Sequence, residues 1–236
     1  MWSGPRNIST ALLRAWENRP DAAVVDEPLY AYYLHETGLE HPGRAQILEA
    51  DETDWRAVVR TLTGPVPRGR SIWYQKHMAH HLLPHVDRGW LDELDHAFLI
   101  RDPREMLISL DRVTPNPRLD DTGLPQQIEI LEHVERRTGK RPPILDSRDV
   151  LEAPEPMLRA FCAALELDFL PEMLSWPPGR RDTDGVWAPH WYANVERSTG
   201  FARYVPRDDA LPEHLKSVYE QCLEPYGKLH ELRLRP

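Results

Sequence analysis

The chain has 236 residues, of which 41% are hydrophobic and 28% charged, a balance that excludes a disordered or fibrous protein. Its net charge of −9 opposes nonspecific attraction to nucleic acid or acidic lipid, so neither is an expected partner. Because no apolar run reaches the ~18 residues of a membrane span and no apolar leader follows Met1, we expect a cytoplasmic protein without a membrane segment.

Short apolar runs alternate with amphipathic segments, which predicts strands and helices in turn around a buried parallel sheet. The expected strands are 22–26, 71–76, 96–101 and 143–146. The expected helices are 9–17, 29–38, 103–112, 124–138, 154–165 and 212–226. The proline-rich stretches are expected to be loops, namely 115–125, 141–156 and 171–189.

These elements predict an α/β fold with one doubly wound domain over residues 1–236, in which helices flank a central parallel sheet of four to five strands. A loop-rich acceptor or lid region is expected around 177–205, followed by a C-terminal helix. Only Met1 and Trp2 precede the first turn. The first strand of such a sheet is therefore either a stub or begins upstream of Met1.

The opening turn has the features of an anion-binding loop. Residues 3–13 read Ser-Gly-Pro-Arg-Asn-Ile-Ser-Thr-Ala-Leu-Leu, so a turn leads directly into a helix. Backbone N–H groups at the helix start, the helix dipole, the Ser9 and Thr10 hydroxyls and the Arg6 guanidinium would together bind phosphate or sulfate. The loop is not a Walker A loop, because the Gly-Lys-Ser/Thr ending is missing. The alternative is a plain N-cap at Ser9 or Thr10.

A second segment places an arginine at the end of an apolar strand. Residues 98–110 read Phe-Leu-Ile-Arg-Asp-Pro-Arg-Glu-Met-Leu-Ile-Ser-Leu, which predicts a strand, an Asp-Pro turn and a helix that carries Ser109. Arg101 would lie at the carboxyl edge of the sheet, where open α/β folds bind ligands, and its planar fork suits phosphate oxygens. The alternative is that Arg101 pairs with Asp102 or another nearby acid.

Together the two segments resemble the sulfotransferases that use 3′-phosphoadenosine 5′-phosphosulfate (PAPS). The family's first loop, Pro-Arg/Lys-Ser-Gly-Ser/Thr-Thr, holds the 5′-phosphosulfate, and its second motif, Arg-Asp-Pro with a serine eight residues after the arginine, holds the 3′-phosphate. The second motif matches Arg101 and Ser109 in sequence and spacing. The segment 145–169 is similar to a further, structural segment of the family. The resemblance thus implies PAPS contacts from Arg101 and Ser109 and from the loop residues Pro5, Arg6, Asn7, Ile8, Ser9 and Thr10.

The sequence departs from the family pattern in both its loop and its tail. Asn7 stands where serine is usual and Ile8 where glycine is usual, which changes how closely the backbone approaches the sulfate. The Arg-Lys-Gly element of eukaryotic cytosolic members is missing from the C-terminal part of the sequence. The aromatic stretches 187–192 and 198–201 occupy that part instead. We expect them to pack a long loop, and the alternative is that they stack on adenine or contact the acceptor.

Sulfuryl transfer needs a positively charged side chain that stabilises the negative charge on the transferred group. It also needs a base that takes up the acceptor proton. Arg6 is placed to supply the charge. Glu27 follows the strand 22–26 and precedes Pro28, so it should lie at the carboxyl edge beside the first loop. It resembles the Glu-Pro that supplies the catalytic glutamate in some bacterial and carbohydrate sulfotransferases. The alternative is an acid that only stabilises a helix start.

The strand 71–76 leads into a second polar turn. Cytosolic sulfotransferases carry Lys-Thr-His here, with a catalytic histidine, whereas this chain has Lys76 followed by histidine and then Met78. Lys76 matches the family lysine and would contact the leaving phosphate, and His80 is the second candidate for the base. The histidines at 77, 80, 81 and 85 have helical metal-ligand spacings, but no carboxylate or cysteine cluster accompanies them, so we expect no metal.

The sequence therefore predicts an enzyme that transfers a sulfuryl group from PAPS, its co-substrate, to a hydroxyl or amine of a small-molecule acceptor. Two alternatives stay open. One is a P-loop phosphotransferase or nucleoside-triphosphate hydrolase. The other is a non-catalytic nucleotide-binding protein with a degenerate site, for which Ile8 and Met78 are the signs. The sequence identifies neither the acceptor nor an oligomeric state.

Overall fold

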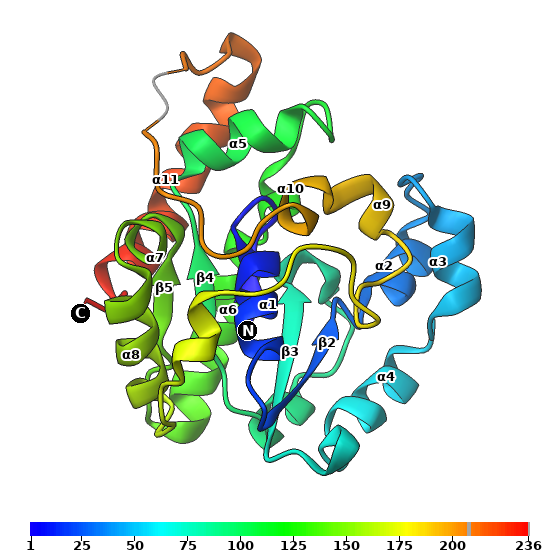
Figure 1. The fold of residues 1–236 in the computed structure, drawn as a ribbon. Coiled ribbons are helices and arrows are strands. Elements are labelled where there is room, and N and C mark those ends of the chain that lie inside the picture. Colours follow the sequence, from blue (N-terminus) through cyan, green and yellow to red (C-terminus); the bar gives the residue numbers. More distant parts are fainter. Residues whose placement is uncertain (207–208, 236) are drawn as a thin grey trace.

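The computed structural model describes residues 1–206 and 209–235 (Figure 1). Its centre is a parallel sheet of five strands in the order β2-β3-β1-β4-β5. The strands are β1 (Trp2–Ser3), β2 (Ala22–Asp26), β3 (Ile72–Met78), β4 (Phe98–Ile100) and β5 (Ile144–Asp146). The predicted doubly wound α/β fold is confirmed. The strand expected at 71–76 ends two residues later than predicted, and the strand expected at 96–101 is shorter at both ends.

The α-helices are α1 (Ser9–Glu17), α2 (Tyr30–Thr37), α3 (Arg44–Ala50), α4 (Trp55–Leu62), α5 (Pro103–Asp111), α6 (Leu124–Thr138), α7 (Ser147–Glu152), α8 (Pro154–Ala164), α9 (Ala188–Trp191), α10 (Ala193–Glu196) and α11 (Lys216–Glu231). The prediction of a loop over 141–156 was wrong, because that stretch contains β5 and α7. The Asp146 side chain caps α7 by accepting a hydrogen bond from Arg148 N at 2.8 Å, and Pro154 occupies the first turn of α8, where proline is tolerated.

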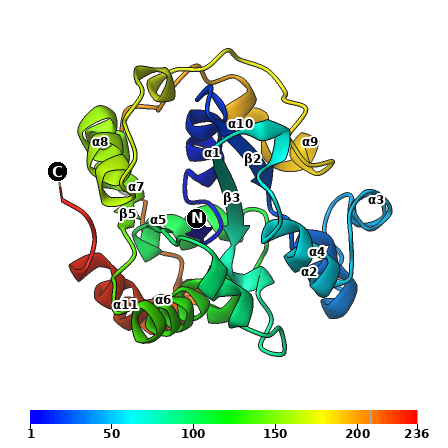
Figure 2. The same ribbon diagram turned by 90° about the horizontal axis from the view of Figure 1, so that it is seen from below.

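Alternating side chains of the strands divide the core into two layers, as the period of two requires. Phe98 and Ile100 face a cluster that includes side chains of α5, α6 and α11, whereas Leu99 between them faces α1 and α8. Figure 2 shows these two groups of helices on opposite sides of the sheet. None of the helices within the described ranges is long and apolar enough to cross a bilayer.

The first strand is a stub of two residues at the centre of the sheet. Trp2 lies opposite His77 of β3 and Phe98 of β4, and its amide donates to Ala97 O at 2.8 Å. The chain then turns at Gly4, where a Cβ atom would lie 2.3 Å from Thr122 O. This close approach requires glycine and aims the following loop over the carboxyl edge of the sheet.

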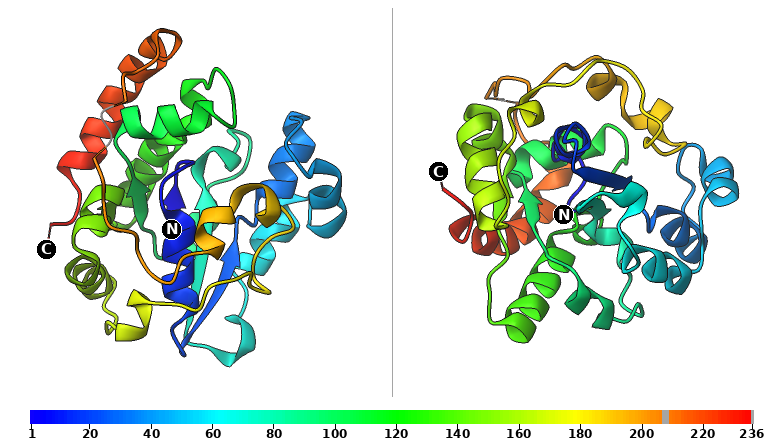
Figure 3. Two further views of the ribbon diagram at one scale, coloured as in Figure 1. Left: turned by 45° about the horizontal axis from the view of Figure 1, so that its top comes forward. Right: turned by 60° about the horizontal axis from the view of Figure 1, so that its bottom comes forward.

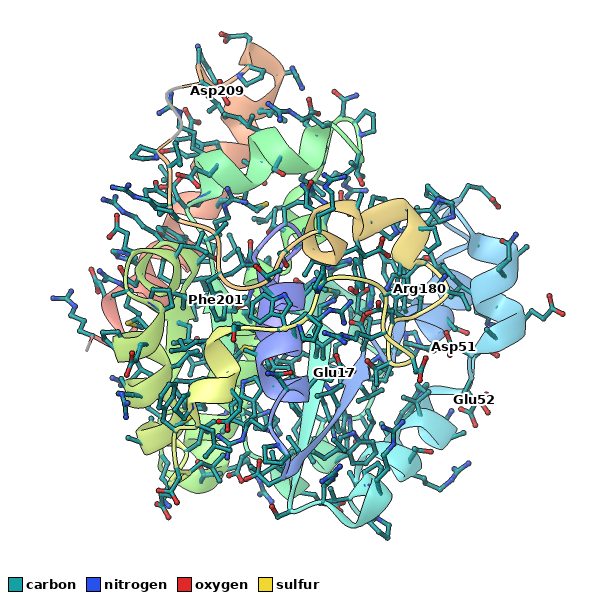
Figure 4. All side chains as sticks on the ribbon, viewed as in Figure 1. Glu17, Asp51, Glu52, Arg180, Phe201 and Asp209 are labelled. Atoms are coloured by element: carbon teal, nitrogen blue, oxygen red, sulfur yellow. The ribbon has the colours of Figure 1, made fainter. Side chains whose placement is uncertain are left out.

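The predicted lid region, the 177–205 segment, crosses the outer side of α1 in Figures 1 and 3. A buried ion pair anchors it there: the Arg14 guanidinium of α1 contacts the two carboxylate oxygens of Asp184 at 2.6 and 2.7 Å. Nearby, Arg181 lies 3.8 Å from the carboxylate of Glu17, and Figure 4 shows Glu17 beneath this segment. Phe201 packs edge-to-face on Trp176, with ring centroids 5.2 Å apart.

Replacing Asp184 by alanine should lower the free energy of unfolding by about 2–3 kcal/mol, because it leaves Arg14 buried without its main hydrogen-bonded partner. Only 1% of the Arg14 side chain is exposed, so water cannot replace the carboxylate. Urea unfolding followed by circular dichroism measures the loss. Asp182→Ala is the matched control, since Asp182 is exposed and lies in the same segment; equal stability of the two variants would contradict the anchor.

Candidate active site

The side chains predicted to carry the chemistry gather at the carboxyl edge of the sheet. Because all five strands are parallel, the loops that follow β1, β2, β3 and β4 emerge on the same side. These loops bring Arg6, Glu27 and Arg101 to that edge, and Lys76 lies near it within β3. Glu27 follows β2, which lies two strands from β1, so roughly 10 Å separates the two strand ends.

The loop after β1 delivers unpaired backbone donors to this edge. The first hydrogen bond within α1 runs from Leu12 N to Ile8 O, at 3.1 Å, so the N–H groups of Ser9, Thr10 and Ala11 precede it. Asn7 is 4% exposed and fixes the loop, since its Nδ2 atom donates to Leu99 O of β4 at 3.2 Å. The helix start thus offers the donor geometry of an anion site.

The two predicted phosphate-binding motifs meet in space although they lie far apart in the sequence. Arg6 Nε donates to Ser109 Oγ at 3.0 Å across 103 residues. Arg101 Nη1 donates to the Arg6 carbonyl at 2.6 Å across 95 residues. Both contacts join the loop that contains Pro5 to the turn and helix after β4. The two segments therefore form one continuous, cationic edge.

The guanidinium of Arg101 is held by an internal acid. Its Nη2 and Nε atoms donate to Glu105 Oε2 at 2.9 and 3.2 Å, and the other oxygen of Glu105 accepts from the Tyr204 hydroxyl at 2.6 Å. Asp102 instead caps α5 through Arg104 N and Glu105 N. Pairing with a nearby acid is thus what the structure shows for Arg101, and a bound phosphate would have to replace the Glu105 carboxylate.

A buried acid–base cluster lies at the ends of β2 and β3. Lys76 Nζ donates to Asp26 Oδ1 at 2.8 Å, to Glu27 Oε1 at 2.7 Å and to the Tyr192 hydroxyl at 2.9 Å. Exposure of the side chain is 1% for Lys76, 1% for Asp26 and 13% for Glu27. Burial alone would lower the pKa of Lys76, but Asp26 and Glu27 raise it well above its ordinary value. Since an ammonium has three donors, contact with a leaving phosphate would require one of these bonds to break.

Glu27 combines a strained backbone conformation with a buried carboxyl group that contacts Lys76. Burial raises its pKa, and the neighbouring Lys76 opposes that rise. Five residues other than glycine have positive φ in the described part of the chain, and Arg6 (φ 61°) and Glu27 (φ 42°) are two of them. Such conformations cost about 1–3 kcal/mol and cluster at functional sites. The strain therefore marks the two residues to which we assigned charge and base.

His80 lies in a different environment from Glu27. It belongs to the 3₁₀ turn Ala79–His81, and its ring packs edge-on against Tyr33 and His81 at centroid distances of 5.3 and 4.5 Å. Burial lowers its pKa to about 3, which makes it a weak base. His77 stacks on Trp2 at 4.4 Å, away from this pair. No group of three or more His, Cys, Asp or Glu side chains among the described residues is placed to hold a metal ion.

Sequence reasoning missed two members of the cluster, Asp26 and Tyr192. Asp26 is the last residue of β2 and directly precedes Glu27, so an acid pair at a strand end was the available signal. Tyr192 comes from the 177–205 segment, and the predictions for its stretch 187–192, loop packing or contact with adenine or the acceptor, did not include a place in this cluster. Its hydroxyl donates to Asp26 Oδ2 and accepts from Trp187 Nε1 at 3.2 Å. No local pattern in the sequence predicts that contact.

Comparisons with known proteins show the domain family and the fold of this chain. A family model described as a sulfotransferase domain matches residues 1–223. Two Arabidopsis thaliana proteins, branched-chain-amino-acid aminotransferase-like proteins 2 and 1, can be aligned with 97% of the chain. Their sequence identities to it are 33% and 35%. The chain spans 40% of the length of each. A solved sulfotransferase domain from the curacin biosynthetic pathway has a TM-score of 0.52 and 13% identity, covering 93% of this chain and 95% of that domain.

Proposed function

The chain belongs to the sulfotransferase domain family, and from that premise we propose that it transfers the sulfuryl group of PAPS to a hydroxyl or amine of a small-molecule acceptor. The observation that carries the proposal is the meeting of Arg6 and Ser109, with Arg101 bound to the Arg6 carbonyl. Two anion-binding segments at one sheet edge suit a ligand with phosphates at both ends of one nucleoside.

The residues at this edge fit such a nucleotide. The N–H groups and hydroxyls at the start of α1, with Arg6, would hold the 5′-phosphosulfate, and Arg101 and Ser109 would hold the 3′-phosphate. Phosphate carries more charge than the Glu105 carboxylate and offers Arg101 more acceptor oxygens, which favours its replacing Glu105 at the guanidinium. PAPS supplies an activated sulfuryl group, and the protein supplies position and charge.

In the proposed reaction Glu27 receives the acceptor proton. A lone pair of the acceptor forms the new bond to sulfur. At the same time the bond between sulfur and the phosphate oxygen breaks, and the electron pair of that bond stays on the phosphate oxygen. Arg6 stabilises the charge that develops on the transferred group. The raised pKa of Glu27 suits a general base, whereas His80 with a pKa near 3 is a weaker one. Lys76 holds the Glu27 carboxylate in place.

Titration with 3′,5′-adenosine bisphosphate tests the nucleotide assignment. Arg101→Ala should weaken its binding about 10- to 100-fold and Ser109→Ala about fivefold, because charge-assisted and neutral hydrogen bonds to the 3′-phosphate are lost. Glu105→Gln should strengthen it about three- to tenfold, since it removes the acid that competes for Arg101. Binding of ATP and adenosine 5′-phosphosulfate, which lack that phosphate, should change less than twofold.

Arg159→Ala is the control, because this arginine lies exposed on α8, where it pairs with Glu155. Equal losses for all three nucleotides would contradict the 3′-phosphate role. Tighter binding of ATP than of the bisphosphate would favour the phosphotransferase alternative. Binding of the bisphosphate without transfer of radiolabelled sulfate to any of a panel of alcohols and amines would favour the non-catalytic alternative.

A further inference from the structure

The acid–base cluster contains one side chain that arrives from outside the sheet. Asp26 ends β2, Glu27 follows it and Lys76 lies within β3, whereas Tyr192 directly follows the short helix α9 in the 177–205 segment. The Tyr192 side chain is buried, and its ring lies 5.2 Å from Lys76 Nζ. The segment therefore reaches into the site and does not merely cover it.

The Tyr192 hydroxyl has a complete set of partners. It donates to Asp26 Oδ2 and accepts from Lys76 Nζ at 2.9 Å and from Trp187 Nε1 at 3.2 Å. A hydroxyl has one donor and two acceptor positions, so all three are used. Because it contacts both members of the Asp26–Lys76 pair, it fixes their separation and leaves the third Lys76 donor for Glu27.

We propose that Tyr192 is a positioning residue: its hydroxyl holds Asp26 and Lys76 in register so that Lys76 orients the carboxylate of Glu27. This role deepens the proposed function and rests on it. The second anchor of the same segment, the buried Asp184–Arg14 pair, keeps the backbone around Tyr192 on the outer face of the sheet. The 177–205 segment is thus part of the catalytic framework.

The charged and titratable groups that act on Glu27 come from four parts of the chain. Lys76 comes from β3 and Asp26 from β2, while Tyr192 comes from the 177–205 segment. Tyr30 of α2 also interacts with Glu27 electrostatically. Burial and Asp26 disfavour the ionised carboxylate of Glu27, whereas Lys76 favours it. The one proton of the Tyr192 hydroxyl is donated to Asp26, so the hydroxyl acts on Glu27 through Lys76. Its loss would let Lys76 move towards Asp26 and away from Glu27, which should raise the pKa of Glu27.

The test compares Tyr192→Phe with the wild type, since phenylalanine keeps the ring and removes only the hydroxyl. Carbon-13 NMR of labelled glutamate carboxyl groups follows the titration of Glu27, whose signal is assigned by its loss in Glu27→Gln. The midpoint should move to higher pH in Tyr192→Phe. Tyr219→Phe on α11 is the control and should leave the midpoint unchanged. Thermal denaturation checks that both variants fold.

Turnover gives a second readout. With PAPS and an accepted substrate, Tyr192→Phe should lower kcat about tenfold, because the hydrogen bonds that hold Asp26 and Lys76 in register are lost. KM for PAPS should change less than twofold. The acid limb of the rate profile should move to higher pH, because the base must be ionised. A folded Tyr192→Phe variant with an unchanged Glu27 midpoint would overturn the positioning role. Failure to bind the bisphosphate would overturn the proposed function but leave the NMR result standing.

Discussion

Replacing Glu27 by glutamine should lower kcat about 10²- to 10⁴-fold, the range for loss of a general base. The amide keeps the shape of the side chain but cannot take up the acceptor proton. Affinity for 3′,5′-adenosine bisphosphate should change less than twofold, because Glu27 follows β2 whereas the nucleotide-binding segments follow β1 and β4. Sulfate transfer from radiolabelled PAPS and calorimetric titration measure the two quantities separately.

The pH dependence of the wild type follows from the same carboxyl group. Burial raises the pKa of Glu27, so kcat/KM should rise with pH over a range above that of an ordinary glutamate. Glu132→Gln, an exposed change on α6, is the matched control for Glu27→Gln. If Glu27→Gln keeps wild-type turnover, the base lies elsewhere, and His80→Gln becomes the next variant to measure.

The sheet edge and the two segments that meet at it could be predicted because their signals are local. A short apolar run followed by a turn predicts a strand end, and parallel strands place all such ends together. The positions of Arg6, Glu27 and Arg101 followed from that rule alone. The family resemblance predicted that both segments contact one nucleotide, and in the structure Arg6 Nε lies 3.0 Å from Ser109 Oγ.

The partners of these side chains could not be predicted, since they depend on packing between distant segments. Arg101 pairs with Glu105, one helical turn away, and not with the adjacent Asp102, because Asp102 caps α5. Tyr192 reaches Asp26 across 166 residues. Nothing in a proline-rich stretch indicates such a contact. Residue type predicted where charge lies, but tertiary structure decided which groups neutralise it.

Replacing Lys76 by methionine should lower the free energy of unfolding by about 3–5 kcal/mol at neutral pH, because it leaves buried carboxylates without their cation. Methionine preserves most of the volume, so the loss is electrostatic and not a cavity effect. Only 1% of the Lys76 side chain is exposed, which prevents water from solvating Asp26 in its place. Chemical denaturation at several pH values measures the loss.

The pH dependence of this loss identifies its cause. Without Lys76 the pKa of Glu27 in the folded state should rise further above its pKa in the unfolded state. At pH values between these two pKa values, the folded protein binds more protons than the unfolded protein does. The deficit of Lys76→Met is therefore largest well above that folded pKa and shrinks as the pH falls through it. Adding Asp26→Asn should restore about half of the stability, since one buried charge is removed with its partner. A deficit that is independent of pH and unchanged in the double variant would show that Lys76 contributes packing alone and that the cluster is not held together by charge.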